Sequence, residues 1–247
     1  MIAPIHTETA VDACARGVRD WVLAERPARL PTERALAAML GVHRGTLRSA
    51  LRVLESEGLV VPRQGSGYAV RDYRTHGGPQ LLGPLLQKRT DRAERIALLR
   101  DLLAVRRALA RTLCERLVEL HRPMPLDAVQ KAIDALDDAV ARRASTAEIA
   151  RLDLGVVSAL VDVTDSDVLR LMLNPVRDVL LGAADLVDAM FQRPAENVAS
   201  WRLLLSLLEA LPRRRTASGD AALFQFLATA LEKGDDRTLR ALSRATR

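Results

Sequence analysis

The chain has 247 residues, of which 49% are hydrophobic and only 3% aromatic, so leucine, alanine and valine must form its core. A chain of this length can bury a substantial core, and we expect two domains that are mostly α-helical. The formal net charge of +6 suits a polyanionic partner. An arginine-rich surface on an ordinary protein explains that charge equally well.

Cys14 and Cys114 lie far apart and outside any metal-ligand spacing. We expect buried thiols rather than a disulfide framework. The first residues lack a basic segment followed by an apolar one, and no apolar run reaches the ~18 residues that a membrane span needs. The sequence therefore predicts a soluble, cytoplasmic protein with no membrane partner.

Signatures of common enzyme classes are missing, because no GxSxG, HExxH, GxxxxGK[ST] or GxGxxG motif occurs. The four histidines are scattered over the first half of the chain, at positions 6, 43, 76 and 121. They suggest no acid–base pair. We therefore expect no enzyme activity and no cofactor.

The first 41 residues carry two helical patterns. One runs from about Thr7 to Glu25, with apolar residues at helical spacing, and it ends before Pro27. The second begins after Thr32, a suitable N-cap, and ends at Gly41, which suits the left-handed position that follows a helix.

A third helix follows Val42. Its apolar residues recur at i, i+3, i+4 and i+7 and form one face, namely Leu47, Ala50, Leu51 and Leu54. Arg44, Arg48 and Arg52 are spaced four apart and form a row that points largely the other way. This is the arrangement in which a recognition helix contacts bases and phosphates.

Two β-prone runs between Leu59 and Val70 flank a Gln-Gly-Ser-Gly turn, which predicts a hairpin. A hairpin directly after a helix-turn-helix is a wing. Its tip would bring Arg63, Gln64 and Gly65 to the sugar-phosphate edge or the minor groove. The alternative is a plain surface hairpin.

Residues 30–70 resemble the winged helix of the GntR family of bacterial transcriptional repressors. The resemblance rests on three motifs: Leu30-Pro31-Thr32-Glu33-Arg34, Leu40-Gly41-Val42-x-Arg44-x-Thr46-Leu47-Arg48, and Leu54-Glu55-x-Glu57-Gly58-Leu59 followed by Arg63-Gln64-Gly65-x-Gly67. It implies DNA contacts from Arg34, His43, Arg44, Gly45, Thr46, Arg48, Arg63, Gln64 and Gly65. Either Arg44 or Arg48 suits a bidentate bond to guanine. His43 and Gly45 depart from the usual pattern, which leaves the operator sequence open.

The rest of the chain is predicted to be helical. Residues 71–83 contain several glycines and indicate a flexible connection, followed by a short apolar helix. Further helices are expected from Asp91 to about residue 120, Leu126–Arg143, Thr146–Val163, Asp165–Met190 with a kink at Pro175, Glu196–Leu211 and Asp220 to about Arg244. We predict a winged-helix domain over 1–74, a linker and short helix over 75–90, and an all-α bundle of six or seven helices over 91–247.

Residues 78–245 resemble, more weakly, the helical effector domain of the FadR-type branch of the same family. Many members hold a divalent metal there with one Asp and three His. Asp153 matches the Asp, but Val157 stands where the first His would be, and no histidine follows His121. We therefore expect no metal, and we interpret Asp153 as a helix-surface or capping carboxylate more readily than as a ligand.

The missing histidines favour an effector bound without metal. The family member that names the branch also lacks the cluster and binds long-chain acyl-CoA, and an apolar interior suits an acyl chain. Candidate effector residues are Arg106 and Asp153, and the run Arg213-Arg214-Arg215 is a further candidate for the CoA phosphates. The alternatives are that Arg106 pairs with a neighbouring acid and that the triple-arginine run is a solvated loop.

Together these features predict a ligand-responsive bacterial transcriptional regulator. It would repress by binding a palindromic operator as a homodimer, and a metabolite such as a fatty acyl-CoA or a fatty acid would modulate it. One alternative is a sensor of a small organic acid without metal. Another is a constitutive DNA-binding factor whose bundle only dimerises. A helical enzyme with an appended DNA-binding domain is the least favoured.

Overall fold

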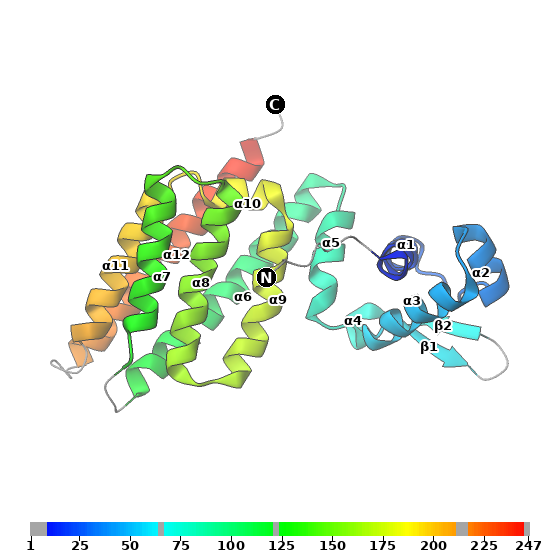
Figure 1. Cartoon of the computed structure of the whole chain (residues 1–247), viewed down its shortest axis with the longest axis horizontal. Helices are drawn as coiled ribbons and strands as arrows, with labels where there is room; N and C mark the ends of the chain where they lie inside the picture. The colour runs from blue at the N-terminus through cyan, green and yellow to red at the C-terminus, as the bar shows by residue number, and fades with distance from the viewer. Residues whose placement is uncertain (1–8, 64–66, 121–123, 211–216, 245–247) are drawn as a thin grey trace, which may run out of the picture. The chain divides into compact units, whose positions relative to one another are not determined.

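The computed structural model describes residues 9–63, 67–120, 124–210 and 217–244. The chain divides into two compact units, Met1–Thr90 and Asp91–Arg247. Figure 1 shows the helices and strands of both units.

Unit 1 is a winged helix-turn-helix, as the sequence predicts (Figure 1). Its elements are α1 (Ala10–Glu25), α2 (Glu33–Leu40), α3 (Arg44–Ser56), β1 (Val60–Arg63), β2 (Gly67–Val70), α4 (Tyr73–His76), the 3-10 helix η1 (Pro79–Leu81) and α5 (Leu82–Lys88). The two strands form an antiparallel hairpin in which Val60 pairs with Val70 and Arg63 with Gly67.

The predicted ends of α2 are confirmed, whereas α1 begins at Ala10, later than the predicted Thr7. The Thr32 hydroxyl accepts a hydrogen bond from the backbone N–H of Ala35, and Gly41 takes the left-handed conformation with φ 65°. At the start of α1, Thr9 and Asp12 exchange side-chain and backbone hydrogen bonds in a capping box. These caps satisfy backbone groups that would otherwise lack partners, and they fix where each helix begins.

The core of unit 1 lies beneath α3. The predicted inner face of this helix, Leu47, Ala50, Leu51 and Leu54, is at most 1% exposed.

At the end of α3, Glu57 accepts two hydrogen bonds from Arg19 of α1, at 2.6 and 2.8 Å. Gly58 follows with φ +77°, and a Cβ there would lie 2.0 Å from the carbonyl oxygen of His76. Only glycine therefore permits α4 to approach the end of α3 so closely.

Residues of η1 and α5 pack within unit 1. Leu81 and Leu86 are each only 2% exposed, and α5 lies against α1. Lys88 is also within 3.8 Å of the Asp20 carboxylate on α1. The glycines that suggested flexibility instead allow tight turns between short helices.

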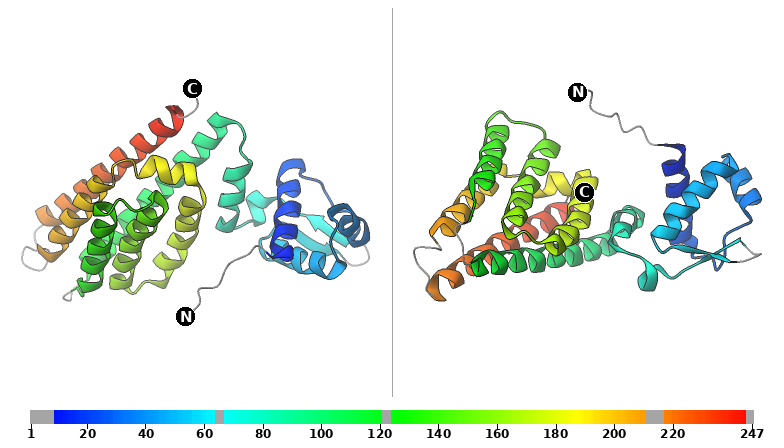
Figure 2. Two further views of the ribbon diagram at one scale, coloured as in Figure 1. Left: turned by 45° about the horizontal axis from the view of Figure 1, so that its top comes forward. Right: turned by 60° about the horizontal axis from the view of Figure 1, so that its bottom comes forward.

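Unit 2 is a helical bundle, in agreement with the predicted fold class. Its described helices are α6 (Arg92–Glu119), α7 (Asp127–Ala141), α8 (Thr146–Thr164), α9 (Asp167–Gly182), α10 (Ala184–Met190), α11 (Pro194–Ala210) and α12 (Ala217–Arg244). The long helices α6 and α12 lie side by side, and α7 packs against α8 (Figure 2). Leucine, valine and isoleucine side chains dominate the buried core.

The predicted single helix over Asp165–Met190 is wrong. The helix is interrupted at Ala183, whose backbone is extended with φ −119° and ψ 96°. This residue separates α9 from α10. Gly182, a poor helix former, precedes the break. Pro175, where a kink was expected, lies inside α9, and the helix continues through it.

Both cysteines are buried and free of disulfides, as expected. Burial raises the pKa of the Cys114 thiol to about 12 and also raises that of Cys14. Both thiols therefore stay protonated at neutral pH, which disfavours metal binding and nucleophilic chemistry.

Among the described helices, none combines the length and the apolar character that crossing a bilayer requires.

Candidate nucleic-acid interface and ligand cavity

The arginine row of α3 faces solvent. Arg44, Arg48 and Arg52 are all exposed, whereas the leucines on the opposite face are buried. The predicted orientation of α3 is thus confirmed. A basic helix face, supported from beneath by a packed core, is the geometry required for insertion into the major groove.

The start of α3 is capped by an imidazole ring. His43 Nδ1 accepts a hydrogen bond from the backbone N–H of Gly45 at 3.2 Å, which is the role usually taken by a serine or threonine oxygen. The helix nevertheless begins at Arg44, so this departure from the family pattern keeps the local geometry. Gly45 is exposed and Thr46 is half-buried. Both residues lie in the first turn of α3, where the helix dipole favours an anion.

Other predicted contact residues surround α3. Arg34 is exposed on α2, and Arg63 is exposed at the end of β1. Gln64 and Gly65 lie outside the described residues. Burial raises the pKa of Tyr68 on β2. The charges of Glu55 and Glu33 add to this increase, whereas those of Arg52 and Arg48 oppose it. We call Arg34, Arg44, Arg48, Arg52 and Arg63 the basic surface.

One pairing within this surface was missed by sequence analysis. Arg48 Nε donates to Glu33 Oε2 at 2.8 Å, and these side chains are 63% and 30% exposed. The hydrogen bond to Glu33 and its charge raise the pKa of Arg48. The sequence gives no sign of this bond, because 15 residues separate Glu33 from Arg48 and no local spacing links them. The pair contributes little to stability in this exposed position, but it holds the Arg48 guanidinium in one direction.

Replacing Glu33 by glutamine should weaken discrimination between DNA sequences. The substitution removes a negative charge from the basic surface, so we expect affinity for random duplex to rise roughly two- to fivefold at low salt. Discrimination should fall, because Arg48 is no longer held in position. Fluorescence anisotropy with specific and random duplexes measures both effects. Glu25→Gln, an exposed change on α1, is the control and should leave discrimination unaltered.

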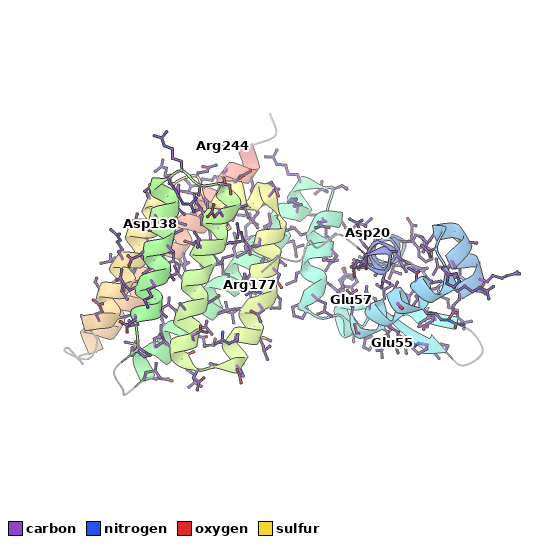
Figure 3. The ribbon with its side chains drawn as sticks, viewed as in Figure 1. Asp20, Glu55, Glu57, Asp138, Arg177 and Arg244 are labelled. Carbon is purple, nitrogen blue, oxygen red and sulfur yellow. The ribbon has the colours of Figure 1, made fainter. Side chains whose placement is uncertain are left out.

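Unit 2 contains a cavity of about 740 Å³. Its walls come from α6, α8, α9, α10, α11 and α12, and most of the lining residues are apolar. Examples are Leu113, Val157, Leu173, Leu204 and Phe226. The volume lies in the range of small-molecule binding sites. Basic side chains outnumber carboxylates in the wall, which contains Arg106, Arg170, Arg177, Lys233 and Arg237 but only Asp153 and Glu196 among the acids. Arg177, which lies on α9, is labelled in Figure 3.

Asp153 is not the surface carboxylate that its sequence context suggested. It is 9% exposed and lies in the cavity wall. Its Oδ1 accepts hydrogen bonds from Trp201 Nε1 at 2.7 Å and from Asn197 Nδ2 at 3.4 Å. Burial raises the pKa of Asp153, while those two bonds and the charge of Arg106 oppose the increase. The surface interpretation fails because α11 supplies both donors, which no pattern along α8 indicates.

Arg106 also lies in the cavity wall, and it pairs with an acid. Its Nη2 is 2.5 Å from Asp235 Oδ1, and Arg107 Nη1 is 2.5 Å from Asp235 Oδ2. Asp235 is 2% exposed on α12. Burial raises its pKa, and the two guanidinium groups oppose that increase. The predicted alternative of a paired Arg106 is therefore what the structure contains, with a partner 129 residues away. The run Arg213-Arg214-Arg215 lies outside the described residues.

The residues around Asp153 do not fit a divalent metal. Trp201 and Asn197 direct N–H donors at the carboxylate, and Val157 occupies the next turn of α8. An indole N–H has no lone pair to offer a cation. Within the part of the chain that the structure describes, no group of three or more His, Cys, Asp or Glu side chains could hold a metal ion.

The fold and these sites define a winged-helix module joined in sequence to a helical domain with a cavity. The model of the bacterial regulatory proteins of the gntR family matches residues 25–70, and the FCD domain model matches residues 101–229. The second match covers more than half of the chain. The chain therefore belongs to the GntR family, and its carboxy-terminal part is an FCD domain.

Relatives of known name agree with this assignment. The HTH-type transcriptional regulator Mce2R of Mycobacterium tuberculosis is 38% identical over 108 residues, which are 44% of each chain. The matched segment thus spans less than half of that relative. The names of the family and of this relative are those of transcriptional regulators, not of enzymes.

Two solved structures share the fold. Lar, described as controlling the agr system of Listeria monocytogenes, has a TM-score of 0.60 at 12% identity, over 96% of this chain and 99% of that one. A GntR regulator from Rhodococcus sp. RHA1 has a TM-score of 0.51 at 18% identity, over 97% of this chain and 100% of that one. At these identities the likeness establishes the fold alone.

Proposed function

We propose that the protein is a ligand-responsive transcriptional repressor of the bacterial cytoplasm. The observation that carries this proposal is the exposed arginine row of α3, which a buried leucine face supports next to a β-hairpin. Arg44 and Arg48 bind guanine edges in the major groove. Arg34, Thr46 and the helix start around His43 and Gly45 contact phosphates. The hairpin, with Arg63 and the adjoining Gln64 and Gly65, contacts the minor groove.

The cavity of unit 2 binds the effector. Its size and apolar walls suit an acyl chain, so a fatty acid or its CoA thioester is the first candidate. The excess of basic side chains in the wall also favours a small organic acid, the second candidate. Arg106 and Asp153 both lie in this wall. The cavity argues against a purely constitutive factor, which would have no need for one.

Ligand binding should change operator affinity. The test measures binding isotherms for an operator fragment, selected from random duplexes by the protein itself, with and without each candidate. A coupled effector should shift the operator affinity by about 5- to 150-fold. An operator affinity that stays constant under saturation by every compound that binds the cavity would remove ligand control from the proposal. Equal affinity for all DNA sequences would contradict the proposed role as a transcriptional regulator.

A palindromic operator requires two copies of the chain, and unit 2 offers a surface for a second copy. Val168, Leu171 and Met172 on α9 are 71%, 62% and 50% exposed and recur at i, i+3 and i+4. Such a stripe is typical of a helix that packs against another helix. Because recognition of two half-sites requires a symmetric pair, we assign this stripe to homodimerisation.

Replacing Leu171 by glutamate should disrupt the dimer. A charge in an apolar interface is costly, while an exposed side chain in the separate chain tolerates the change. Size-exclusion chromatography with light scattering should give twice the 27.1 kDa chain mass for the unaltered protein and the single mass for the variant. Leu203→Glu, at an exposed leucine of α11, serves as the matched control and should remain dimeric. A dimeric Leu171→Glu would rule out the α9 stripe.

A further inference from the structure

Arg106 is the cavity side chain whose hydrogen bonding is incomplete. Its Nη2 pairs with Asp235, but its Nε–H is buried and finds no acceptor among the described residues. A buried donor without a partner is unfavourable, so this arrangement is less stable than one in which the whole guanidinium is bound. A turn of the guanidinium toward the cavity would expose the Nε–H to a ligand.

Asp235 does not depend on Arg106 alone. Arg107 Nη1 lies 2.5 Å from the second oxygen, Oδ2, of the same carboxylate. If Arg106 released Asp235, Arg107 would still neutralise the buried charge. The penalty for an unpaired buried carboxylate therefore does not arise, and Arg106 is free to exchange partners.

The three other arginines of the cavity wall have acidic partners close to solvent. Arg170 pairs with Asp162, Arg177 with Asp178 and Arg237 with Glu196. Each of these pairs is substantially exposed, so water already satisfies its remaining hydrogen bonds. Arg106, at 17% side-chain exposure, is the arginine of the wall with the least access to water.

We infer that Arg106 binds the carboxylate of an apolar acid in the cavity, exchanging its bond to Asp235 for bonds to the ligand. This inference rests on the proposed function, since it takes the cavity as the effector site. A guanidinium presents parallel N–H donors that match a carboxylate, and the acid would give the Nε–H its missing acceptor. The apolar walls hold the hydrocarbon part. Asp153 has partners of its own, since Trp201 and Asn197 both donate hydrogen bonds to its Oδ1.

The exchange would also alter the packing of two helices. Arg106 lies on α6 and Asp235 on α12, and these helices lie side by side (Figure 2). Once the ligand holds Arg106, only Arg107 joins α6 to this carboxylate. Ligand binding thereby changes the α6–α12 contact without any metal.

Binding of dodecanoate and of 1-dodecanol tests the inference, because the two probes differ only in the polar group. Trp201 lies in the cavity wall, so its fluorescence reports binding in a full-length chain in which Trp21, the other tryptophan, is replaced by phenylalanine. We expect dodecanoate to bind at least about tenfold more tightly than dodecanol. Arg106→Gln should reduce this preference to within about twofold of unity, whereas Arg111→Gln, an exposed change on α6, should retain it.

Asp235→Asn provides a second, independent readout. It weakens the competing partner of Arg106, so dodecanoate should bind more tightly than to the unaltered chain, with dodecanol unaffected. Acetate should bind far more weakly than dodecanoate if the apolar walls contribute. Dodecanoyl-CoA, whose acyl carbonyl is an uncharged thioester, should show no loss of affinity on Arg106→Gln.

Several results would overturn the inference. If Arg106→Gln still preferred dodecanoate to dodecanol, the inference would be wrong. It would also be wrong if binding of dodecanoyl-CoA depended on Arg106 as strongly as binding of dodecanoate does. Neither result would contradict the proposed regulator. Failure of both twelve-carbon probes to bind would overturn the inference together with the apolar effector. The proposed DNA-binding role is tested independently, by measuring operator binding.

Discussion

Removing either Arg44 or Arg48 should abolish most of the protein's preference for its operator. Each side chain is exposed on α3 and can make a bidentate hydrogen bond to a guanine edge. Loss of one such contact should lower specific affinity by about 5- to 150-fold per half-site. Binding to random duplex should fall much less, because only one phosphate-attracting charge is lost. Arg44→Ala and Arg48→Ala are measured against both duplexes at the same salt concentration.

Two controls sharpen this comparison. Arg111→Ala removes an exposed arginine from α6 of unit 2 and should leave both affinities unchanged. Arg34→Ala, by contrast, should weaken specific and random binding alike and reduce the salt dependence, since Arg34 is assigned to phosphate. Operator affinities of Arg44→Ala and Arg48→Ala equal to that of the unaltered protein would show that α3 does not recognise the bases.

Replacing Leu51 by alanine should markedly destabilise unit 1. Leu51 is 1% exposed on the buried face of α3, directly opposite the arginine row. Loss of a buried leucine typically costs about 2–5 kcal/mol, because both the transfer free energy and the packing around the cavity are lost. Since domains are stable by only about 5–15 kcal/mol, this change should reduce specific and random DNA binding together.

Hydrogen exchange in a urea series, measured by mass spectrometry on peptides from α1 and α3, determines the local stability. Met39→Ala is the matched control, because Met39 lies in the same unit but is 70% exposed. It should leave the exchange of both peptides nearly unchanged. Equal stability of the Leu51→Ala and Met39→Ala variants would contradict the assignment of the α3 core face.

The sequence predicts unit 1 well because its signals are local. The apolar residues of α3 recur at helical spacing, so Leu47 and Leu54 identify the buried face and Arg48 the exposed one. Thr32 and Gly41 mark the two ends of α2 by their own chemistry. The hairpin follows from a glycine-containing turn between β-prone runs. Each of these features is decided within a few residues.

The sites in the cavity depend on partners that are distant in sequence, and these could not be predicted. Asp153 is buried because Trp201 and Asn197 on α11 approach it. Arg106 meets Asp235 only because α6 and α12 pack together. A single sequence gives the faces of each helix but not which faces meet, so the role of Asp153 was misjudged.

Side-chain pairs in unit 1 also depend on how helices pack, which a single sequence does not give. The bond between Glu33 and Arg48 depends on how α2 and α3 cross, although each residue was recognised by itself. Glu55 and Glu57, labelled in Figure 3, lie at the far end of α3, yet only Glu57 pairs with Arg19 of α1. Spacing alone does not distinguish these two acids.

Interference by guanine N7 methylation tests the central claim most directly. A methyl group on N7 blocks one of the two atoms that an arginine fork contacts in the major groove. If α3 enters that groove in both copies of a dimer, methylation of guanines in two half-sites, about one helical turn or a multiple of it apart, should prevent binding. The interference at one position of each half-site should disappear in Arg44→Ala or Arg48→Ala. Binding that tolerates N7 methylation throughout the operator would contradict the account.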